Sequence, residues 1–217
     1  MEYLTFGLDS HNQVHGENYS DDWREFDVVC NGEPYAHVSL SVYGKYNACN
    51  ALATAAVSYF TGIDGQVYAQ AVNAFTGAGR RLEFKGKVNG ADVYDDYAHH
   101  PGEIHALLEA VRSMPYERVI FAFQPHTYSR TQALFSDFVR ELRKVDLVVL
   151  GEIYAARERN TIGISSRDLA AQIPGSKCFS TLPKITQYLR SIAKPGDVIV
   201  TVGAGDIYKA GEALCKE

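Results

Sequence analysis

The chain has 217 residues, of which 46% are hydrophobic and 22% charged, and its formal net charge is −5. This composition is typical of a globular protein with one large domain or two modest ones. The acidic balance argues against a nucleic-acid-binding surface. No apolar stretch approaches the ~18 residues that a membrane-spanning helix needs. We therefore expect small-molecule partners, no nucleic acid and no membrane.

The cysteines are widely spaced and form no CxxC pair: Cys30, Cys49, Cys178 and Cys215. This spacing does not indicate a disulfide framework or a zinc site, so a reducing compartment is expected. The N-terminal residues have neither the basic segment nor the apolar core of an export signal. Both observations predict a cytoplasmic protein.

The first forty residues combine short β-prone runs with turn formers. Residues 27–30 and 37–42 flank the turn sequence 31–34, which predicts hairpins or a sheet edge. We find little hydrophobic core within this stretch alone. An alanine-rich helix is expected over 47–60 and a shorter helix over 66–75.

A glycine-rich segment, 76–81, predicts a hinge or domain junction. Beyond it, two strands flank Asn89-Gly90, the signal for a tight hairpin. Strands and helices then alternate, with strands expected at 118–123, 147–150 and 197–202, and helices at 102–114, 131–144, 166–173, 183–192 and 206–216. This alternation predicts a doubly wound α/β domain with a mostly parallel sheet.

Four predicted strands are followed by polar or glycine-rich segments: 95–101, 124–130, 151–157 and 203–206. In doubly wound sheets, ligands bind beyond the carboxyl ends of the strands. The opposite strand ends carry ordinary turns. The four segments therefore predict one shared site.

The ionisable residues of these segments also have structural explanations. Asp95 and Asp96 face opposite ways along a strand, so we expect one to be solvated and at most one to point at a ligand. One of His99 and His100 is expected to cap or pack against the following helix. The other is expected to act in the site, because His126 follows the neighbouring strand.

Arg130 is a natural bidentate clamp for a carboxylate or a phosphate. The segment 203–206 lacks the third glycine of a dinucleotide fingerprint, because position 208 is tyrosine. A tight strand-to-helix turn and a role in lining the cleft explain it equally well. Upstream, Asn47 and Asn50 lie one helical turn apart and suit a purine edge, although Asn47 could instead be a helix N-cap.

Five segments, in order, closely resemble the Mur ligase family: GKYNACN at 44–50, GRR at 79–81, DDYAHHP at 95–101, QPHTYSRT at 124–131 and GAGD at 203–206. The resemblance covers essentially the whole chain. It implies that residues 1–78 are the C-terminal remnant of a central ATP-binding domain. Residues 79–217 would then be the family's doubly wound C-terminal domain.

The resemblance also implies two sets of site residues. The ATP set comprises Asn47 and Asn50 at the adenine, Arg81 near the phosphates and Asp96 at the ribose. The L-alanine set comprises Tyr97, His99 and Arg130, with Arg130 on the carboxylate. No residue of the chain is assigned to a metal. Two positions depart from the family pattern: Tyr46 replaces a common histidine, and Thr127 replaces a common second arginine.

The resemblance implies an ATP-dependent carboxylate–amine ligase that uses ATP and Mg²⁺. It would join L-alanine to UDP-N-acetylmuramate through an acyl phosphate, in peptidoglycan precursor synthesis. No lysine of the chain is followed by Ser or Thr, so a GxxxxGK[ST] phosphate-binding loop is absent. We therefore expect this loop, the magnesium ligands and the UDP-sugar domain to lie upstream in an intact enzyme, and the chain alone to be inactive.

Two other interpretations remain open. A metal-dependent hydrolase could use Asp95 or Asp96 with His99, His100 and His126 as ligands. Alternatively, the chain could be a non-catalytic module that binds a nucleotide or an amino acid.

Overall fold

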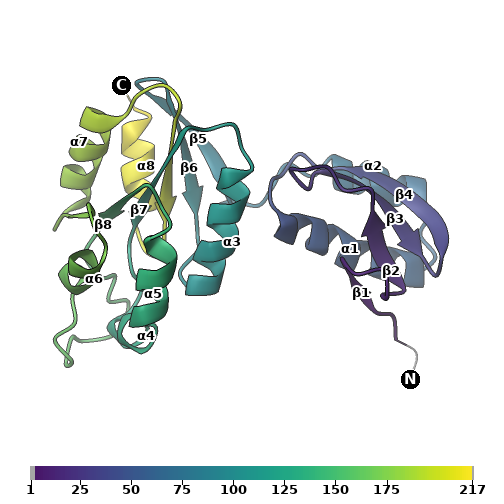
Figure 1. Cartoon of the computed structure of the whole chain (residues 1–217), viewed down its shortest axis with the longest axis horizontal. Coiled ribbons are helices and arrows are strands. Elements are labelled where there is room, and N and C mark those ends of the chain that lie inside the picture. Colours follow the sequence, from purple (N-terminus) through teal and green to yellow (C-terminus); the bar gives the residue numbers. More distant parts are fainter. Residues whose placement is uncertain (1–2, 217) are drawn as a thin grey trace. The chain divides into compact units, whose positions relative to one another are not determined.

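The computed structural model describes residues 3–216 and divides into two compact units (Figure 1). The first unit extends to Gly77 and includes Glu109–Met114, and the second comprises Ala78–Leu108 and the chain from Pro115 onward. The boundary after Gly77 falls within the glycine-rich segment 76–81. Within the described residues, no helix combines the length and the apolar character needed to cross a bilayer.

The first unit contains a four-stranded sheet in the order β1-β2-β3-β4 and two helices. The strands are β1 (Phe6–Gly7), β2 (Val14–Glu17), β3 (Glu25–Cys30) and β4 (Glu33–Ser39), and the helices are α1 (Lys45–Phe60) and α2 (Gly65–Asn73). β1 pairs with β2 in parallel, and the other pairs are antiparallel. The predicted turn joins β3 to β4 through Asn31 and Gly32, which both have positive φ.

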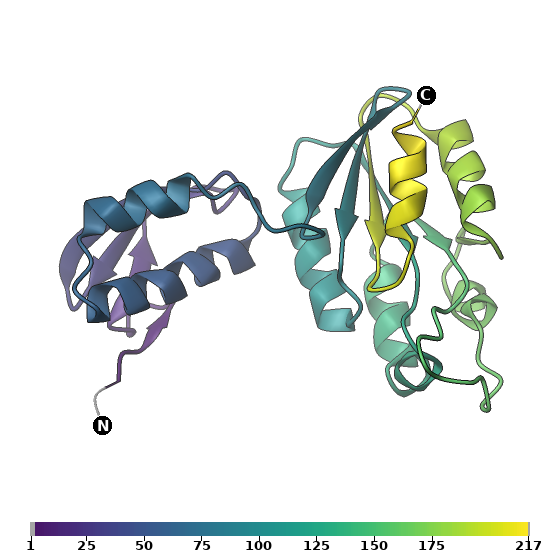
Figure 2. The same cartoon turned by 180° about the vertical axis from the view of Figure 1, so that it is seen from behind.

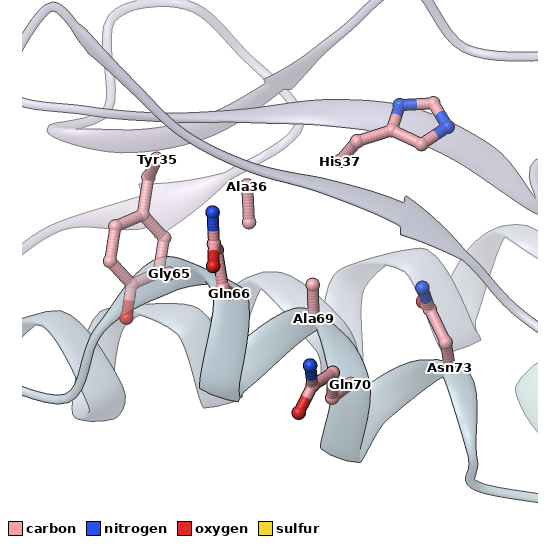
Figure 3. A pocket seen from close by; sticks show the side chains of 8 residues that line it. All are labelled: Tyr35, Ala36, His37, Gly65, Gln66, Ala69, Gln70 and Asn73. Atoms are coloured by element: carbon pink, nitrogen blue, oxygen red, sulfur yellow. The ribbon is translucent and has the colours of Figure 1, made fainter.

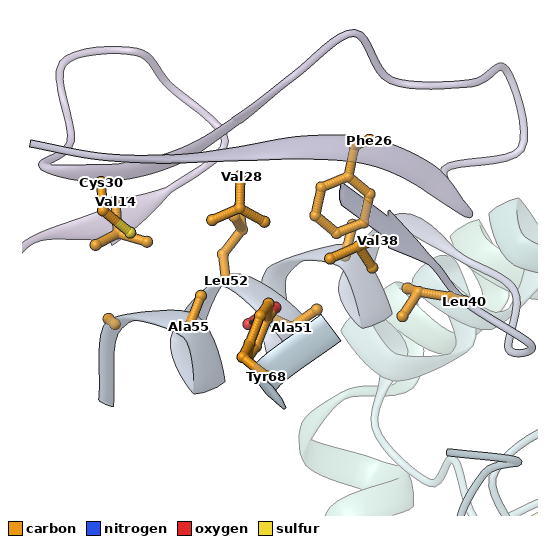
Figure 4. Close-up of a cluster of buried hydrophobic side chains, with 12 residues drawn as sticks. Val14, Phe26, Val28, Cys30, Val38, Leu40, Ala51, Leu52, Ala55 and Tyr68 are labelled. Atoms are coloured by element: carbon orange, nitrogen blue, oxygen red, sulfur yellow. Dashed lines mark hydrogen bonds between the residues drawn. The ribbon is translucent and has the colours of Figure 1, made fainter. Parts of the chain in front are cut away.

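The first unit has a core of its own, which the strands of the first forty residues form together with α1 and α2. Phe26, Val28 and Cys30 alternate along β3 and are buried on one face. They belong to one hydrophobic cluster with Leu52 of α1 and Tyr68 of α2 (Figure 4). A sheet that buries one face needs an apolar residue only at every second position. The core is therefore assembled from residues scattered along the sequence.

The second unit contains a six-stranded sheet in the order β5-β6-β10-β7-β8-β9. The strands are β5 (Glu83–Val88), β6 (Ala91–Asp96), β7 (Arg118–Phe123), β8 (Leu147–Leu150), β9 (Lys177–Cys178) and β10 (Asp197–Val202). β5 is antiparallel to β6 across the Asn89-Gly90 turn, and every other pair is parallel. The predicted doubly wound, mostly parallel sheet is confirmed.

Helices cover both faces of this sheet (Figures 1 and 2). They are α3 (Pro101–Arg112), α4 (Tyr128–Ala133), α5 (Phe135–Leu142), α6 (Ser166–Gln172), α7 (Leu182–Ile192) and α8 (Tyr208–Leu214). On one face, Ile120 of β7 belongs to a cluster with residues of α7 and α8. On the other face, the ring of Phe123 lies 5.5 Å from that of Phe138 in α5. The central strands are thus buried on both sides, as parallel sheets require.

One predicted helix is wrong. The expected continuous helix over 131–144 is two helices, α4 and α5, separated at Leu134, whose φ of −110° and ψ of 20° are not helical. The apolar spacing continues through this residue, so the periodicity alone does not reveal the break.

Candidate functional site

The carboxyl ends of four neighbouring strands form one edge of the second sheet. Asp96 of β6 is in register with Val202 of β10, and Val202 with Phe123 of β7. Phe123 is in turn in register with Leu150 of β8. The four polar segments therefore leave the sheet side by side, and the expectation of a common edge is confirmed.

A row of rings follows this edge. The Tyr97 and His99 ring centroids are 5.5 Å apart, and those of His99 and His126 are 5.9 Å apart. His126 also stacks on Tyr154, with centroids 5.6 Å apart and planes inclined by 20°. The backbone N–H of Thr127 donates to the carbonyl of Tyr154 at 2.9 Å. This bond and the stacking join the loop after β7 to the loop after β8.

Arg130 lies next to His126, with 3.3 Å between its Nη1 and the Nδ1 of the imidazole. An arginine can only donate, so in this contact Nδ1 accepts and the imidazole proton is on Nε2. Burial, Arg130 and His99 together hold the pKa of His126 below its ordinary value. Among the described residues Arg130 has no carboxylate partner. A neutral imidazole beside this guanidinium leaves the positive charge available for a carboxylate ligand.

Thr127 positions the helix that carries Arg130. It precedes α4 with a positive φ of 65°, and its hydroxyl accepts the N–H of Arg130 at 3.4 Å. Its carbonyl accepts the hydroxyl of the fully buried Thr131 at 2.7 Å. A positive φ with an extended ψ costs a non-glycine residue about 1–3 kcal/mol, and it persists where the surroundings fix it.

Both aspartates of the DDY segment are buried, so the expectation that one is solvated is wrong. Asp95 is 1% exposed and Asp96 4% exposed. The two side chains do point to opposite sides of β6, but both sides are covered. Asp96 accepts the backbone N–H groups of Leu82 at 2.8 Å and Ala98 at 2.7 Å. Burial raises the pKa of Asp96, while these two donors favour its charged form.

The two histidines lie in different surroundings, and the expectation that one of them caps the following helix is confirmed. The Nδ1 of His100 accepts the N–H of Gly102 at 3.2 Å, so this side chain caps the start of α3. His99 instead lies in the row of rings, with its Nδ1 2.9 Å from the carbonyl of Tyr97. Glu103 accepts the backbone N–H groups of both histidines, at 2.8 and 3.2 Å.

Gln124 is a structural member of the edge that the sequence did not single out. Its Oε1 accepts the N–H groups of Asp206 and Ile207 at 2.9 and 3.2 Å, and its Nε2 donates to the Asp206 carboxylate at 2.9 Å. A Cβ on Gly205 would lie 2.3 Å from Gln124 Oε1, and one on Gly203 would lie 2.7 Å from the Gln124 carbonyl. The segment 203–206 is therefore a tight strand-to-helix turn built on Gln124.

Arg80 was also missed, because the resemblance directed attention to Arg81. Its Nε donates to the Asp95 carboxylate at 2.9 Å. Asp95 also accepts the hydroxyl of Thr201 at 2.6 Å. Arg81 is exposed, and its Cζ lies 5.9 Å from the centroid of the Tyr97 ring. The sequence pattern that could have indicated this contact is a pair of adjacent arginines upstream of a pair of adjacent aspartates.

Asn47 and Asn50 lie in α1 of the first unit, whereas the other predicted site residues lie in the second. The N-cap of α1 is Gly44, so the N-cap explanation for Asn47 is wrong. The two side chains lie on one helix face, with 3.4 Å between the Nδ2 of Asn50 and the Oδ1 of Asn47. The Nδ2 of Asn47 donates to the carbonyl of Tyr43 at 2.8 Å.

The first unit also contains a groove of about 350 Å³ between β4 and α2 (Figure 3). Its lining is rich in uncharged polar groups: Tyr35, Ala36, His37, Gly65, Gln66, Ala69, Gln70 and Asn73. Neither Asn47 nor Asn50 lines it. The Oδ1 of Asn73 accepts the N–H of Ser39 at 2.8 Å, which ties α2 to the end of β4.

The interpretation as a metal-dependent hydrolase gains no support from this geometry. Between residues 3 and 216, no three His, Cys, Asp or Glu side chains gather as a metal site would require. Asp95 and Asp96 are occupied by donors from the protein, and His100 caps a helix.

Comparisons with known proteins identify the family of the chain. Residues 80–205 match the family described as Mur ligase, glutamate ligase domain. The chain belongs to the Mur ligase family. It is 42% identical over 224 residues to the UDP-N-acetylmuramate–L-alanine ligase of Agathobacter rectalis, covering 100% of this chain and 49% of that protein. It is 40% identical over 227 residues to the enzyme of the same name from Caldanaerobacter subterraneus subsp. tengcongensis, covering 97% and 49%.

A solved Mur ligase has the same architecture. The crystal structure of UDP-N-acetylmuramate-alanine ligase from Thermotoga maritima superposes with a TM-score of 0.79 at 26% identity, covering 95% of this chain and 46% of that one. This Mur ligase chain thus spans about half the length of the relatives it matches.

Proposed function

We propose that this chain is the amino-acid-binding part of an ATP-dependent ligase that joins L-alanine to UDP-N-acetylmuramate in peptidoglycan precursor synthesis. The observation that carries the proposal is the single sheet edge on which Tyr97, His99, His126 and Arg130 lie together. The identity of 40–42% to ligases of that name supports the choice of substrates. A cytoplasmic location follows from those substrates.

ATP, when bound, supplies the phosphoryl group that converts the muramate carboxylate into an acyl phosphate. The amine of L-alanine then attacks the acyl carbon, and the intermediate expels phosphate and loses a proton to give the amide. The residues of this chain contribute positioning. Arg130 holds the alanine carboxylate through charged hydrogen bonds, while Tyr97 and His99 line the same edge. Orienting the amine toward the acyl carbon removes a large entropic part of the barrier.

The nucleotide is proposed to use a second set of residues. Arg81 is exposed and suits a phosphate, and Asp96 has carboxylate lone pairs left beyond its two backbone donors for a ribose hydroxyl. Asn47 and Asn50 present adjacent amides that suit an adenine edge. We propose that residues 1–78 derive from the ATP-binding domain, and that the phosphate-binding loop and Mg²⁺ ligands belong to the other half of the longer protein.

The decisive test is Arg130→Ala in the longer protein that includes the region upstream of this chain. Losing charged hydrogen bonds worth about 1.5–3 kcal/mol should raise KM for L-alanine by about one to two orders of magnitude. KM for ATP should stay within about twofold. Arg143→Ala, in which an arginine bonded to the Gln172 carbonyl is removed, is the control and should change neither constant. An unchanged alanine dependence would exclude Arg130 as the clamp.

The 217-residue chain alone is proposed to be inactive. Purified chain should release no phosphate from ATP in the presence of L-alanine and UDP-N-acetylmuramate. Calorimetry with ATP and with L-alanine separately tests the interpretation as a binding module, for which a saturable heat without turnover is expected. Ligase turnover by the purified 217-residue chain would contradict the assignment of the missing functions to the upstream half.

A further inference from the structure

Arg80 links three segments of the second unit. Its Nε donates to Asp95 at 2.9 Å, and its Nη2 donates to the carbonyl of Gly203 at 2.7 Å. Its Cζ lies 4.7 Å from the ring centroids of both Tyr97 and Tyr208. Guanidinium suits this arrangement, because its donors lie in one plane and its faces stack on aromatic rings. One side chain thus connects the end of β6, the turn after β10 and the start of α8.

The backbone on both sides of Arg81 is held in the left-handed region. The φ angles are 59° at Arg80 and 45° at Leu82. The N–H of Arg80 donates to Glu83 at 2.8 Å, and the N–H of Leu82 donates to Asp96 at 2.8 Å. Non-glycine residues keep this conformation where their surroundings determine it. Asp95 holds one flank of Arg81 through the Arg80 side chain, and Asp96 holds the other flank through the backbone.

Arg80 also contacts Tyr97. The N–H of Tyr97 donates to the carbonyl of Arg80 at 2.8 Å, and the ring packs on the Arg80 guanidinium. Tyr97 is nevertheless 36% exposed. Arg81 is also exposed, and it forms no ion pair within residues 3–216. Two exposed side chains, Arg81 and Tyr97, therefore lie on backbone that Arg80 holds in place.

We propose that Arg80 and Asp95 are a positioning pair that sets the directions in which Arg81 and Tyr97 face the substrates. The identity of the ligand, a nucleoside triphosphate met by Arg81, rests on the proposed function. Arg80 acts through its two neighbours, because its Nε and Nη2 already donate to Asp95 and to the Gly203 carbonyl. Without the pair, the segment 79–82 samples other conformations, and Arg81 meets the phosphates in only a fraction of them.

The second unit contains a matched ion pair at the opposite edge of the same sheet. Arg118, at the start of β7, donates through Nε to Asp197 at 2.8 Å and through Nη2 to the same carboxylate at 2.5 Å. Asp197 is 1% exposed, as is Asp95, and the side chains of Arg118 and Arg80 are 31% and 26% exposed. The two pairs share their chemistry and burial and differ in which edge of the sheet they occupy. Arg118→Ala therefore controls for the loss of a buried ion pair as such.

The first measurement is amide hydrogen exchange on the 217-residue chain. Arg80→Ala and Asp95→Asn should each accelerate exchange at the amides of Arg81, Leu82 and Tyr97 by at least about tenfold, the size of effect that local opening produces. Arg118→Ala should leave these three amides unchanged. This comparison requires no ligand, so it tests the structural role of the Arg80–Asp95 pair even if the proposed function is wrong. Equal exchange at these amides in Arg80→Ala and Arg118→Ala would overturn the proposal.

The second measurement is kinetic and uses the longer ligase. Arg80→Ala should raise KM for ATP about 10- to 100-fold, the usual effect of misplacing a binding group by about 1 Å. Arg118→Ala should leave KM for ATP unchanged. Accelerated exchange in the chain with an unaltered KM for ATP would refute the positioning role. If the unmutated longer protein shows no alanine-dependent consumption of ATP, the proposed function is refuted. The exchange comparison still tests whether Arg80 and Asp95 hold the backbone around Arg81.

Discussion

Gly205 occupies the most crowded point of the site edge, and Gly205→Ala tests whether the turn at 203–206 depends on that crowding. The added Cβ would lie 2.3 Å from Gln124 Oε1 and 2.7 Å from Cγ of Tyr154. Gln124 cannot simply swing away, because it is 6% exposed and its Oε1 accepts two backbone N–H groups.

The expected cost has two parts. Overpacking a well-filled site costs about 1–3 kcal/mol, and each buried N–H that loses its acceptor costs about 1–3 kcal/mol. Partial relaxation of Gln124 and Tyr154 offsets some of this. We therefore expect the free energy of unfolding of the second unit to fall by about 3 kcal/mol, which is roughly a 150-fold change in the folded-to-unfolded ratio.

Urea unfolding followed by far-UV circular dichroism measures this loss, and hydrogen exchange at the amides of Asp206 and Ile207 locates it. Gly175→Ala is the control. Gly175 has a φ of +75° and no atom within 4 Å of an added Cβ. This change should therefore lower the free energy of unfolding only by the cost of a left-handed backbone at a non-glycine residue, about 1 kcal/mol. If Gly205→Ala is no more destabilising than Gly175→Ala, the close approach of the turn to Gln124 and Tyr154 is not a determinant of stability.

Two further predictions concern single groups. Because Arg130 is one cause of the lowered pKa of His126, Arg130→Ala should raise that pKa toward the ordinary 6.5, as followed by NMR titration, and a fall or no change would contradict the contact. In the unaltered chain the lowered folded pKa means that the contribution of His126 to stability is present above about pH 6.5 and is lost as the pH falls through the folded value. In the first unit, Tyr68→Phe removes a buried hydroxyl that donates to the Ala51 carbonyl at 2.9 Å, so urea unfolding should show a loss of about 1 kcal/mol. Tyr3→Phe, at a side chain that is 77% exposed, should show none, and equal effects of the two changes would exclude the hydrogen bond as the cause.

The sheet and the gathering of polar segments at one of its edges could be predicted because two simple rules apply to the second half of the chain. Alternating strands and helices specify a parallel sheet, and the carboxyl ends of its parallel strands lie at the same edge, which carries the candidate site. The two-residue period of a strand correctly predicted that the side chains of Asp95 and Asp96 point to opposite sides of β6. It could not show that both faces of β6 are covered, because that depends on helices far away in the sequence.

The partners of individual polar groups were less predictable. Arg80 contacts Gly203, 123 residues away, and Gln124 contacts Asp206, 82 residues away. No local pattern encodes such pairs. The strand β9 has only two residues, too few for any periodicity, and the end of α4 at Leu134 depends on local backbone angles that an uninterrupted apolar spacing conceals.

The contact between α2 and β4 has a consequence for how the first unit meets other chains. A Cβ on Gly65 would lie 1.9 Å from the carbonyl oxygen of Tyr35, so only glycine lets the helix begin against this outer strand. Asn73, at the end of the same helix, accepts a hydrogen bond from the N–H of Ser39. An exposed outer strand is a template for intermolecular β-pairing and aggregation. Here α2 lies against that strand near both of its ends, which disfavours the pairing of a further strand with β4.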